Sequence, residues 1–171
     1  MGLAGVQVLL EGLAGTVLVY AFTGTTAFAA GGVRSILTTD PLIARSAFAL
    51  LVAGFGVKAA LMPLHGWLPD AMVAPTPVSG LLHAVAVVKS GVFGIVRVVL
   101  YVFGPDGVET LGVGTPLAIV AAATMTLAAV LALQQDRLKR GLAYSTVSQL
   151  SYIVIGVAVL TPAAVHGALL H

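Results

Sequence analysis

The sequence predicts an all-α membrane protein: a bundle of about five transmembrane helices, with the start of another and one helix broken by proline. Of its 171 residues, 59% are hydrophobic and only 8% are charged, and the mean hydropathy is +1.09. A soluble domain of this length needs more polar surface than that. The apolar residues also fall into long runs, and prolines cluster between two of these runs.

Five apolar runs are long enough to be interpreted as membrane helices, for which about 20 residues are needed. They cover residues 3–22, 47–62, 78–102, 115–133 and 142–160. Polar stretches such as residues 103–114 connect them, and a further helix begins at Thr161–Pro162. We therefore expect residues 1–171 to form a single transmembrane domain. The uncharged run 115–133 is expected to serve as scaffold or lipid contact.

Several classes of chemistry are excluded by composition. The chain has no cysteine, which excludes disulfides, cysteine-ligated iron–sulfur clusters and thiolate zinc sites. It has no GxGxxG or P-loop motif for a nucleotide, and its net charge of +2 is too small and dispersed for a nucleic-acid partner. We expect no cofactor, no metal and no catalytic redox site in this chain.

Two lysines, Lys58 and Lys89, lie inside apolar runs. A lysine at mid-membrane costs about 2.5–3.5 kcal/mol on insertion scales, so it is usually compensated by a bundle interior, a partner charge or a water-filled path. The alternative is snorkelling of the ammonium to the headgroups, which fits Lys58 better than Lys89 because Lys58 is nearer the end of its run. Two lysines in neighbouring spans predict a cation-relay path.

A proline-rich hinge, residues 62–77, separates the two lysines. Pro63 and Pro69 are predicted to interrupt the helix because proline lacks an amide hydrogen and clashes with the preceding turn. Pro75 and Pro77 bias the residues before them towards extended geometry. A broken helix at membrane depth tends to line an ion or substrate site. The alternative is an ordinary interfacial loop.

The segment KAALMPLHGWLPDAMVAPTPVSGLLHAVAVVKSGVFGIVR resembles the central part of antiporter-like, proton-translocating membrane subunits. These occur in respiratory complex I (NADH:quinone oxidoreductase), Mrp-type cation/proton antiporters and membrane-bound hydrogenases. DRLKRGLAYSTVSQLSYIVIG is similar to the next signature of that family, and the two lysines are 31 residues apart (89 − 58), like the family's pair. The resemblance implies that Lys58 precedes the break in the family's seventh helix and that Lys89 is the relay lysine of the eighth.

The resemblance implies translocation of protons, or of sodium and protons, through a buried lysine relay. The chain would be a non-redox transport subunit of an NADH dehydrogenase-like or Mrp-type complex. Its partners would be other membrane subunits, the lipid bilayer and protons or sodium ions. Family members have about fourteen helices, so the chain is expected to be a fragment covering roughly the sixth to the start of the eleventh. The alternatives are a structural membrane subunit without conduction and a secondary transporter of a solute.

Three further residues are candidates for proton translocation: His83, His65 and Glu11. Imidazole titrates near neutral pH, which suits proton transfer. His83 is six residues before Lys89, about 240° away around a helix, so the two would communicate only through water. His65 lies in the hinge, and Glu11 interrupts the first apolar run without matching the family's fifth-helix glutamate. A structural role is the alternative for each of the three.

Residues 134–141 (QQDRLKRG) form a short, basic loop. By the positive-inside rule this loop is predicted to be cytoplasmic, in a prokaryotic plasma membrane. Arg34, Arg45 and Arg97 are expected on the opposite side, so basic residues number three on each side, and the compactness of the loop decides the orientation.

A polar stripe follows this loop, with the i, i+3, i+4, i+7 spacing of one helix face. We expect it to serve helix packing through small hydroxyls, with lining of a water chain as the alternative. Its residues are Ser145, Ser148, Gln149 and Tyr152.

Overall fold

The computed structural model describes residues 13, 16–17, 20–21, 40–71 and 87–170. Some of the expectations above fall outside this part of the chain. They concern most of the first apolar run, residues 72–77 of the hinge, and the individual residues Glu11, Arg34, Pro75, Pro77 and His83.

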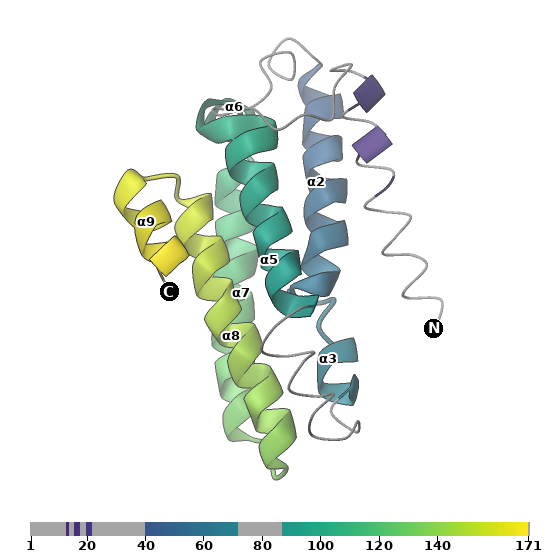
Figure 1. The fold of residues 1–171 in the computed structure, drawn as a ribbon, viewed down its shortest axis with the longest axis vertical. Coiled ribbons are helices and arrows are strands. Elements are labelled where there is room, and N and C mark those ends of the chain that lie inside the picture. The colour runs from purple at the N-terminus through teal and green to yellow at the C-terminus, as the bar shows by residue number, and fades with distance from the viewer. Residues whose placement is uncertain (1–12, 14–15, 18–19, 22–39, 72–86, 171) are drawn as a thin grey trace.

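Every element in the described part of the chain is a helix (Figure 1). The order is α2 (Pro41–Lys58), α3 (Trp67–Asp70), α5 (Val87–Arg97), the π-helix η4 (Val98–Phe103), α6 (Gly104–Leu111), α7 (Gly114–Leu133), α8 (Leu138–Ala158) and α9 (Pro162–Leu170). Four stretches are long and apolar enough to cross a membrane: Pro41–Lys58, Val87–Leu111, Gly114–Leu133 and Leu138–Ala158. The predicted class, an all-α membrane protein, is confirmed.

Helices α7 and α8 form the most closely packed pair in the bundle. The short 134–137 connection makes them antiparallel neighbours that run side by side (Figure 1). Small buried residues, Ala121 and Ala128 on α7 and Ala143 on α8, lie along this pair. Small side chains let helix backbones approach closely in lipid, where packing rather than water exclusion drives association.

Helices α2 and α5 meet through two glycines of α5. A Cβ atom on Gly91 would collide with the backbone of Lys58 and Ala59, and a Cβ on Gly94 would overlap the ring of Phe55. The lack of side chains at these two positions allows the end of α2 to lie directly on α5. The backbone of Lys58 is therefore fixed against a residue only two positions beyond Lys89.

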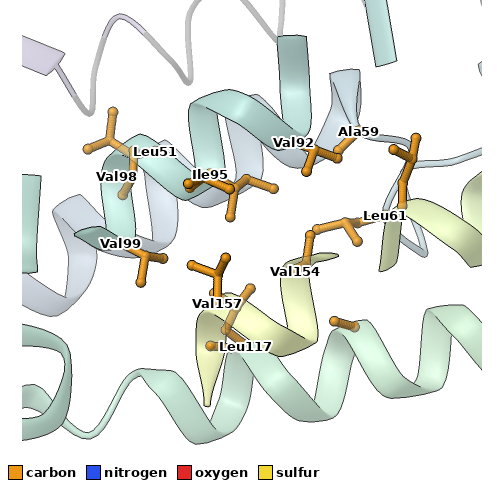
Figure 2. Packing of buried hydrophobic residues seen from close by; sticks show 14 of the residues in the cluster. Leu51, Ala59, Leu61, Val92, Ile95, Val98, Val99, Leu117, Val154 and Val157 are labelled. Atoms are coloured by element: carbon orange, nitrogen blue, oxygen red, sulfur yellow. The ribbon is translucent and has the colours of Figure 1, made fainter. Parts of the chain in front are cut away.

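Apolar side chains from several helices fill the centre of the bundle. Figure 2 shows Leu61, which follows α2, pointing into the same space as Ile95 of α5 and Val157 of α8. Ile95, Val154 and Val157 are fully buried in the chain, and Leu61 is almost so. This core joins the α2–α5 pair to the α7–α8 pair.

The connection predicted at residues 103–114 is largely a short helix, α6. The long helix α5–η4 stops at Gly104, whose φ of 73° and ψ of 162° are not helical. Pro105 and Asp106 then favour a new helix start, because proline suits the first helical positions and a carboxylate is stabilised near a helix N-terminus. Arg45 Nε donates to the Leu111 carbonyl at 2.9 Å, so α6 covers the end of the bundle where α2 begins (Figure 1).

Substituting Gly91 with alanine should destabilise the bundle, although alanine is the better helix former. The new methyl group collides with the Lys58–Ala59 backbone, and overpacking of this kind costs about 1–3 kcal/mol. Gly167→Ala is the matched control, because nothing lies within 4 Å of its Cβ position. Thermal unfolding of the detergent-solubilised protein measures the difference, and equal melting temperatures for the two variants would contradict the packing described.

Candidate functional site

The interruption expected near Pro63 is present, but it begins earlier in the chain. Helix α2 ends at Lys58, and Ala60 adopts the left-handed conformation with φ of 56°. Leu61 N–H donates to the Gly56 carbonyl at 2.9 Å and Ala60 N–H donates to the Val57 carbonyl at 3.1 Å. This pair of bonds is a Schellman motif, which usually has glycine at the left-handed position.

Pro69 does not break a helix. It lies in the four-residue helix α3, Trp67–Asp70, at a first-turn position where no amide hydrogen is required. The non-helical segment is therefore residues 59–66, between α2 and α3.

Side chains satisfy the backbone groups that the interruption releases. The Trp67 indole Nε1 donates to the Val57 carbonyl at 2.6 Å. Met62 N–H donates to Thr124 Oγ1 on α7 at 3.1 Å, and the Thr124 hydroxyl donates to the Val120 carbonyl at 2.7 Å. Thr124 is fully buried near the middle of the 20-residue helix α7. The interruption of α2 thus lies level with the centre of a membrane-spanning helix.

Lys58 and Lys89 are exposed in the described part of the chain. The burial expected for a relay inside the bundle is therefore not provided by these helices alone. Lys58 is the last residue of α2, where a helix C-terminus favours a positive charge. Lys89 lies in the first turn of the described part of α5.

Lys89 opens onto a groove of about 650 Å³ between α5, α8 and α9. Its polar lining consists of Lys89 with Ser145, Thr146 and Gln149 of α8. Apolar residues such as Phe93 form the remaining wall. The fold thus places a membrane lysine beside hydroxyl and amide groups from a helix more than fifty residues further along the chain.

The polar stripe of α8 divides into two parts. Ser148 is buried and donates to the Met125 carbonyl of α7 at 3.1 Å, which is the packing role predicted for the stripe. Ser145 and Gln149 instead line the Lys89 groove, while Tyr152 is exposed. A single helix face therefore serves both helix packing and the wall of a groove.

His65 lies in the interrupted segment, where it is partly buried. Its ring is 6.0 Å from that of Tyr144 on α8, and its Nδ1 atom is buried without a hydrogen-bond partner among the described residues. A buried nitrogen of this kind is costly unless a water or another group satisfies it. His65 therefore remains a candidate for proton transfer.

The comparisons with known proteins agree with this arrangement. A family model described as "NADH:quinone oxidoreductase/Mrp antiporter, TM" matches residues 2–171. The chain belongs to this family. The resemblance inferred from the two lysines, the hinge and the α8 signature is confirmed.

Relatives in the NADH:quinone oxidoreductase/Mrp antiporter family are much longer than this chain. It is 43% identical over 131 residues to NAD(P)H-quinone oxidoreductase subunit 5, chloroplastic, of Adiantum capillus-veneris, which covers 74% of this chain and 17% of that protein. The protein of the same name from Poa pratensis is 41% identical over 128 residues, covering 75% and 17%. The chain thus spans 17% of the length of these curated relatives.

Two solved structures share the fold. A chain in the Mrp complex from Dietzia sp. DQ12-45-1b aligns with a TM-score of 0.81 and 36% identity, over 99% of this chain and 19% of that one. A chain in a membrane-bound sulfane sulfur reductase, an archaeal respiratory membrane complex, aligns with a TM-score of 0.71 and 28% identity, over 91% and 31%. Both belong to multi-subunit membrane complexes.

Thr124 contributes to the site around the interruption, but the sequence does not predict it. The apolar run 115–133 that contains it is expected from the sequence to be scaffold or lipid contact, and nothing in the sequence distinguishes Thr124 from Thr115 and Thr126 in the same run. Its partner, the Met62 amide, is identifiable only when α7 is seen beside the interruption. Two polar contacts elsewhere were equally hidden.

One of these contacts is the ion pair of Asp70 with Arg140 at 3.9 Å, whose side chains are 80% and 41% exposed. A pair this exposed contributes at most about 1 kcal/mol, but it places the end of α3 beside the basic loop. The other contact is that of Arg97 with two aromatic rings: its guanidinium lies 5.1 Å from the Phe93 ring centre and 4.8 Å from that of Tyr101. Such cation–π contacts stabilise a charge near lipid.

Cysteine labelling tests whether the Lys89 groove contains water. A cysteine replacing Ser145, which lines the groove, should react with a small hydrophilic thiol reagent. A cysteine replacing Ser151 on the same helix should not, because Ser151 is almost fully buried. Labelling is compared by mass spectrometry in the assembled protein. Equal reactivity of the two positions, or reaction at 151 alone, would contradict a hydrated groove.

Proposed function

We propose that this chain translocates protons, or exchanges sodium for protons, as part of an antiporter-like subunit, with Lys58 and Lys89 as the groups that carry the charge. The family assignment supports membrane translocation in general. The observation that carries the proposal is the interruption of α2 at mid-membrane level directly after Lys58. Ordered but non-helical backbone at that depth is typical of ion sites in transporters.

The two lysines are held in a fixed relation by the α2–α5 contact. The Lys58 backbone lies on Gly91, two residues after Lys89, so both lysines project from the same helix pair. Like charges disfavour each other's charged form. A stepwise relay requires coupling of this kind between its carriers, so that loading one with a proton promotes release from the next.

Both lysines are exposed residues in the described helices, so other protein must supply the low-dielectric surroundings of their side chains. This chain spans only 17% of its curated relatives, and the remaining length of such a protein, together with partner subunits, would cover these surfaces. Desolvation lowers the pKa of a lysine and a nearby anion raises it. A carboxylate that approaches or withdraws would then switch Lys58 between holding and releasing its proton.

His65 and His83 are proposed as additional carriers, with Glu11 as a further candidate. His65 is supported by its place in the interrupted segment and by its buried nitrogen. The redox reaction of an oxidoreductase complex would be carried out by other subunits.

Lysine substitutions in the full-length protein test the relay. Lys58→Met and Lys89→Met should each abolish most ion translocation by the assembled complex in vesicles. Lys58→Arg should fail as well, because guanidinium does not release its proton at accessible pH. The control is Lys139→Met, which removes a lysine of the basic segment 134–141 at the start of α8 and should leave translocation unchanged. Normal transport by Lys58→Arg would show that Lys58 is a fixed charge and would favour the structural alternative.

We also propose that residues 134–141 face the cytoplasm in a prokaryotic plasma membrane. The dense basic loop supports this orientation. Cysteines replacing Glu109 in α6, which is exposed, and Gln135 in the loop should label from opposite faces, with position 109 accessible to an impermeant reagent outside intact cells. Labelling of position 135 from outside would reverse the topology.

A further inference from the structure

Thr124 of α7 has its hydroxyl group bonded to the backbone that follows Lys58. We infer that Thr124 is a positioning residue for ion translocation: it fixes the interrupted segment of α2 and, through it, the place of Lys58. The inference rests on the proposed function of Lys58, but the contact itself can be measured independently of transport.

Met62 is the only residue from 59 to 64 whose amide hydrogen bond leaves α2 and its own segment. Three of the amides bond back to α2: Ala59 to the Phe55 carbonyl, Ala60 to Val57 and Leu61 to Gly56. Leu64 N–H bonds to the Leu61 carbonyl, and Pro63 has no amide hydrogen. The Met62 amide alone crosses to another helix, where it meets Thr124 Oγ1 at 3.1 Å. This hydrogen bond ties the segment to α7.

The Thr124 hydroxyl is suited to this role because it is fully buried and bonded on both sides. It accepts from Met62 and donates to the Val120 carbonyl one turn earlier at 2.7 Å. The bond to the Val120 carbonyl fixes the direction of the Thr124 oxygen lone pairs, one of which accepts from Met62. At this depth no bulk water can replace the acceptor, so a Met62 amide without Thr124 must stay unsatisfied or move.

A second hydrogen bond links α7 to the helix that forms the wall of the Lys89 groove. Met125, the residue after Thr124, accepts a hydrogen bond from Ser148 Oγ of α8 at 3.1 Å. Ser148 is followed by Gln149, which lines the groove beside Lys89. Consecutive residues of α7 therefore hold the backbone after Lys58 on one side and the helix facing Lys89 on the other.

Three variants of the full-length protein separate positioning from general destabilisation. Thr124→Val keeps the side-chain shape and removes the acceptor, whereas Thr124→Ser retains the hydroxyl. Thr126→Val is the matched control, because among the described residues the Thr126 hydroxyl bonds only to the Ala122 and Ala123 carbonyls of its own helix. Each variant is assembled in its complex and examined by hydrogen exchange of residues 59–66 and by ion translocation in vesicles.

Thr124→Val should speed exchange of the Met62 amide by about tenfold, since a buried donor loses its acceptor, and should lower translocation in parallel. Thr124→Ser should restore both properties, and Thr126→Val should change neither. If Thr124→Val does not assemble, Thr124→Cys keeps a weak acceptor and should give an intermediate effect on both measurements.

Unchanged exchange at Met62 in Thr124→Val, or in Thr124→Cys where that variant replaces it, would overturn the inference. So would faster exchange with full transport, because the segment would then be loosened without consequence for the ions. Failure of the proposed function is distinguished by Lys58→Met: normal transport in that variant rejects the relay, whereas the exchange measurement still decides whether Thr124 holds the segment.

Discussion

Hydrogen bonding of the backbone at mid-membrane is the constraint on which this structure depends. A helix satisfies its own amides and carbonyls, so an interruption at that depth needs a substitute for each bond it removes. The chain provides a left-handed Ala60, which closes the end of α2 by bonds within the segment, and the indole of Trp67, which bonds the Val57 carbonyl. Thr124 supplies the one acceptor that the segment cannot provide itself. The site is therefore built by three helices rather than by the hinge alone.

The helix end has a direct electrostatic consequence for Lys58. A cation at a helix C-terminus gains about 0.3–1 kcal/mol from the aligned peptide dipoles, whereas a lysine at the bilayer centre costs about 2.5–3.5 kcal/mol on insertion scales. The dipole of α2 thus offsets less than half of the cost. The remaining stabilisation of the Lys58 charge must come from water or from an opposite charge next to the exposed lysine.

The sequence was sufficient for the fold class, the family and the existence of the interruption, because hydropathy, the two lysines and the prolines are local signals. It was not sufficient for the position of the break, which is set by a left-handed alanine that has no sequence signature. It also assigned residues 103–114 to a connection, although Pro105 and Asp106 begin a helix there. The contact of Thr124 with Met62, the α7 partner of Ser148 and the Lys89 groove escaped prediction because only the packing decides which face of a helix meets which neighbour.

The glycine contact between α2 and α5 limits how the two helices that carry Lys58 and Lys89 can move. Gly91 lies so close to the Lys58–Ala59 backbone that a single methyl group does not fit between the helices. Close-packed interfaces of this kind shift between discrete arrangements rather than deforming continuously. Small sliding motions of α2 along α5 would force these backbones apart. In the proposed relay, the changes that would accompany loading and release of a proton are therefore expected in the lysine side chains, in water and in the groove beside Lys89, while the helix pair that holds both lysines stays fixed.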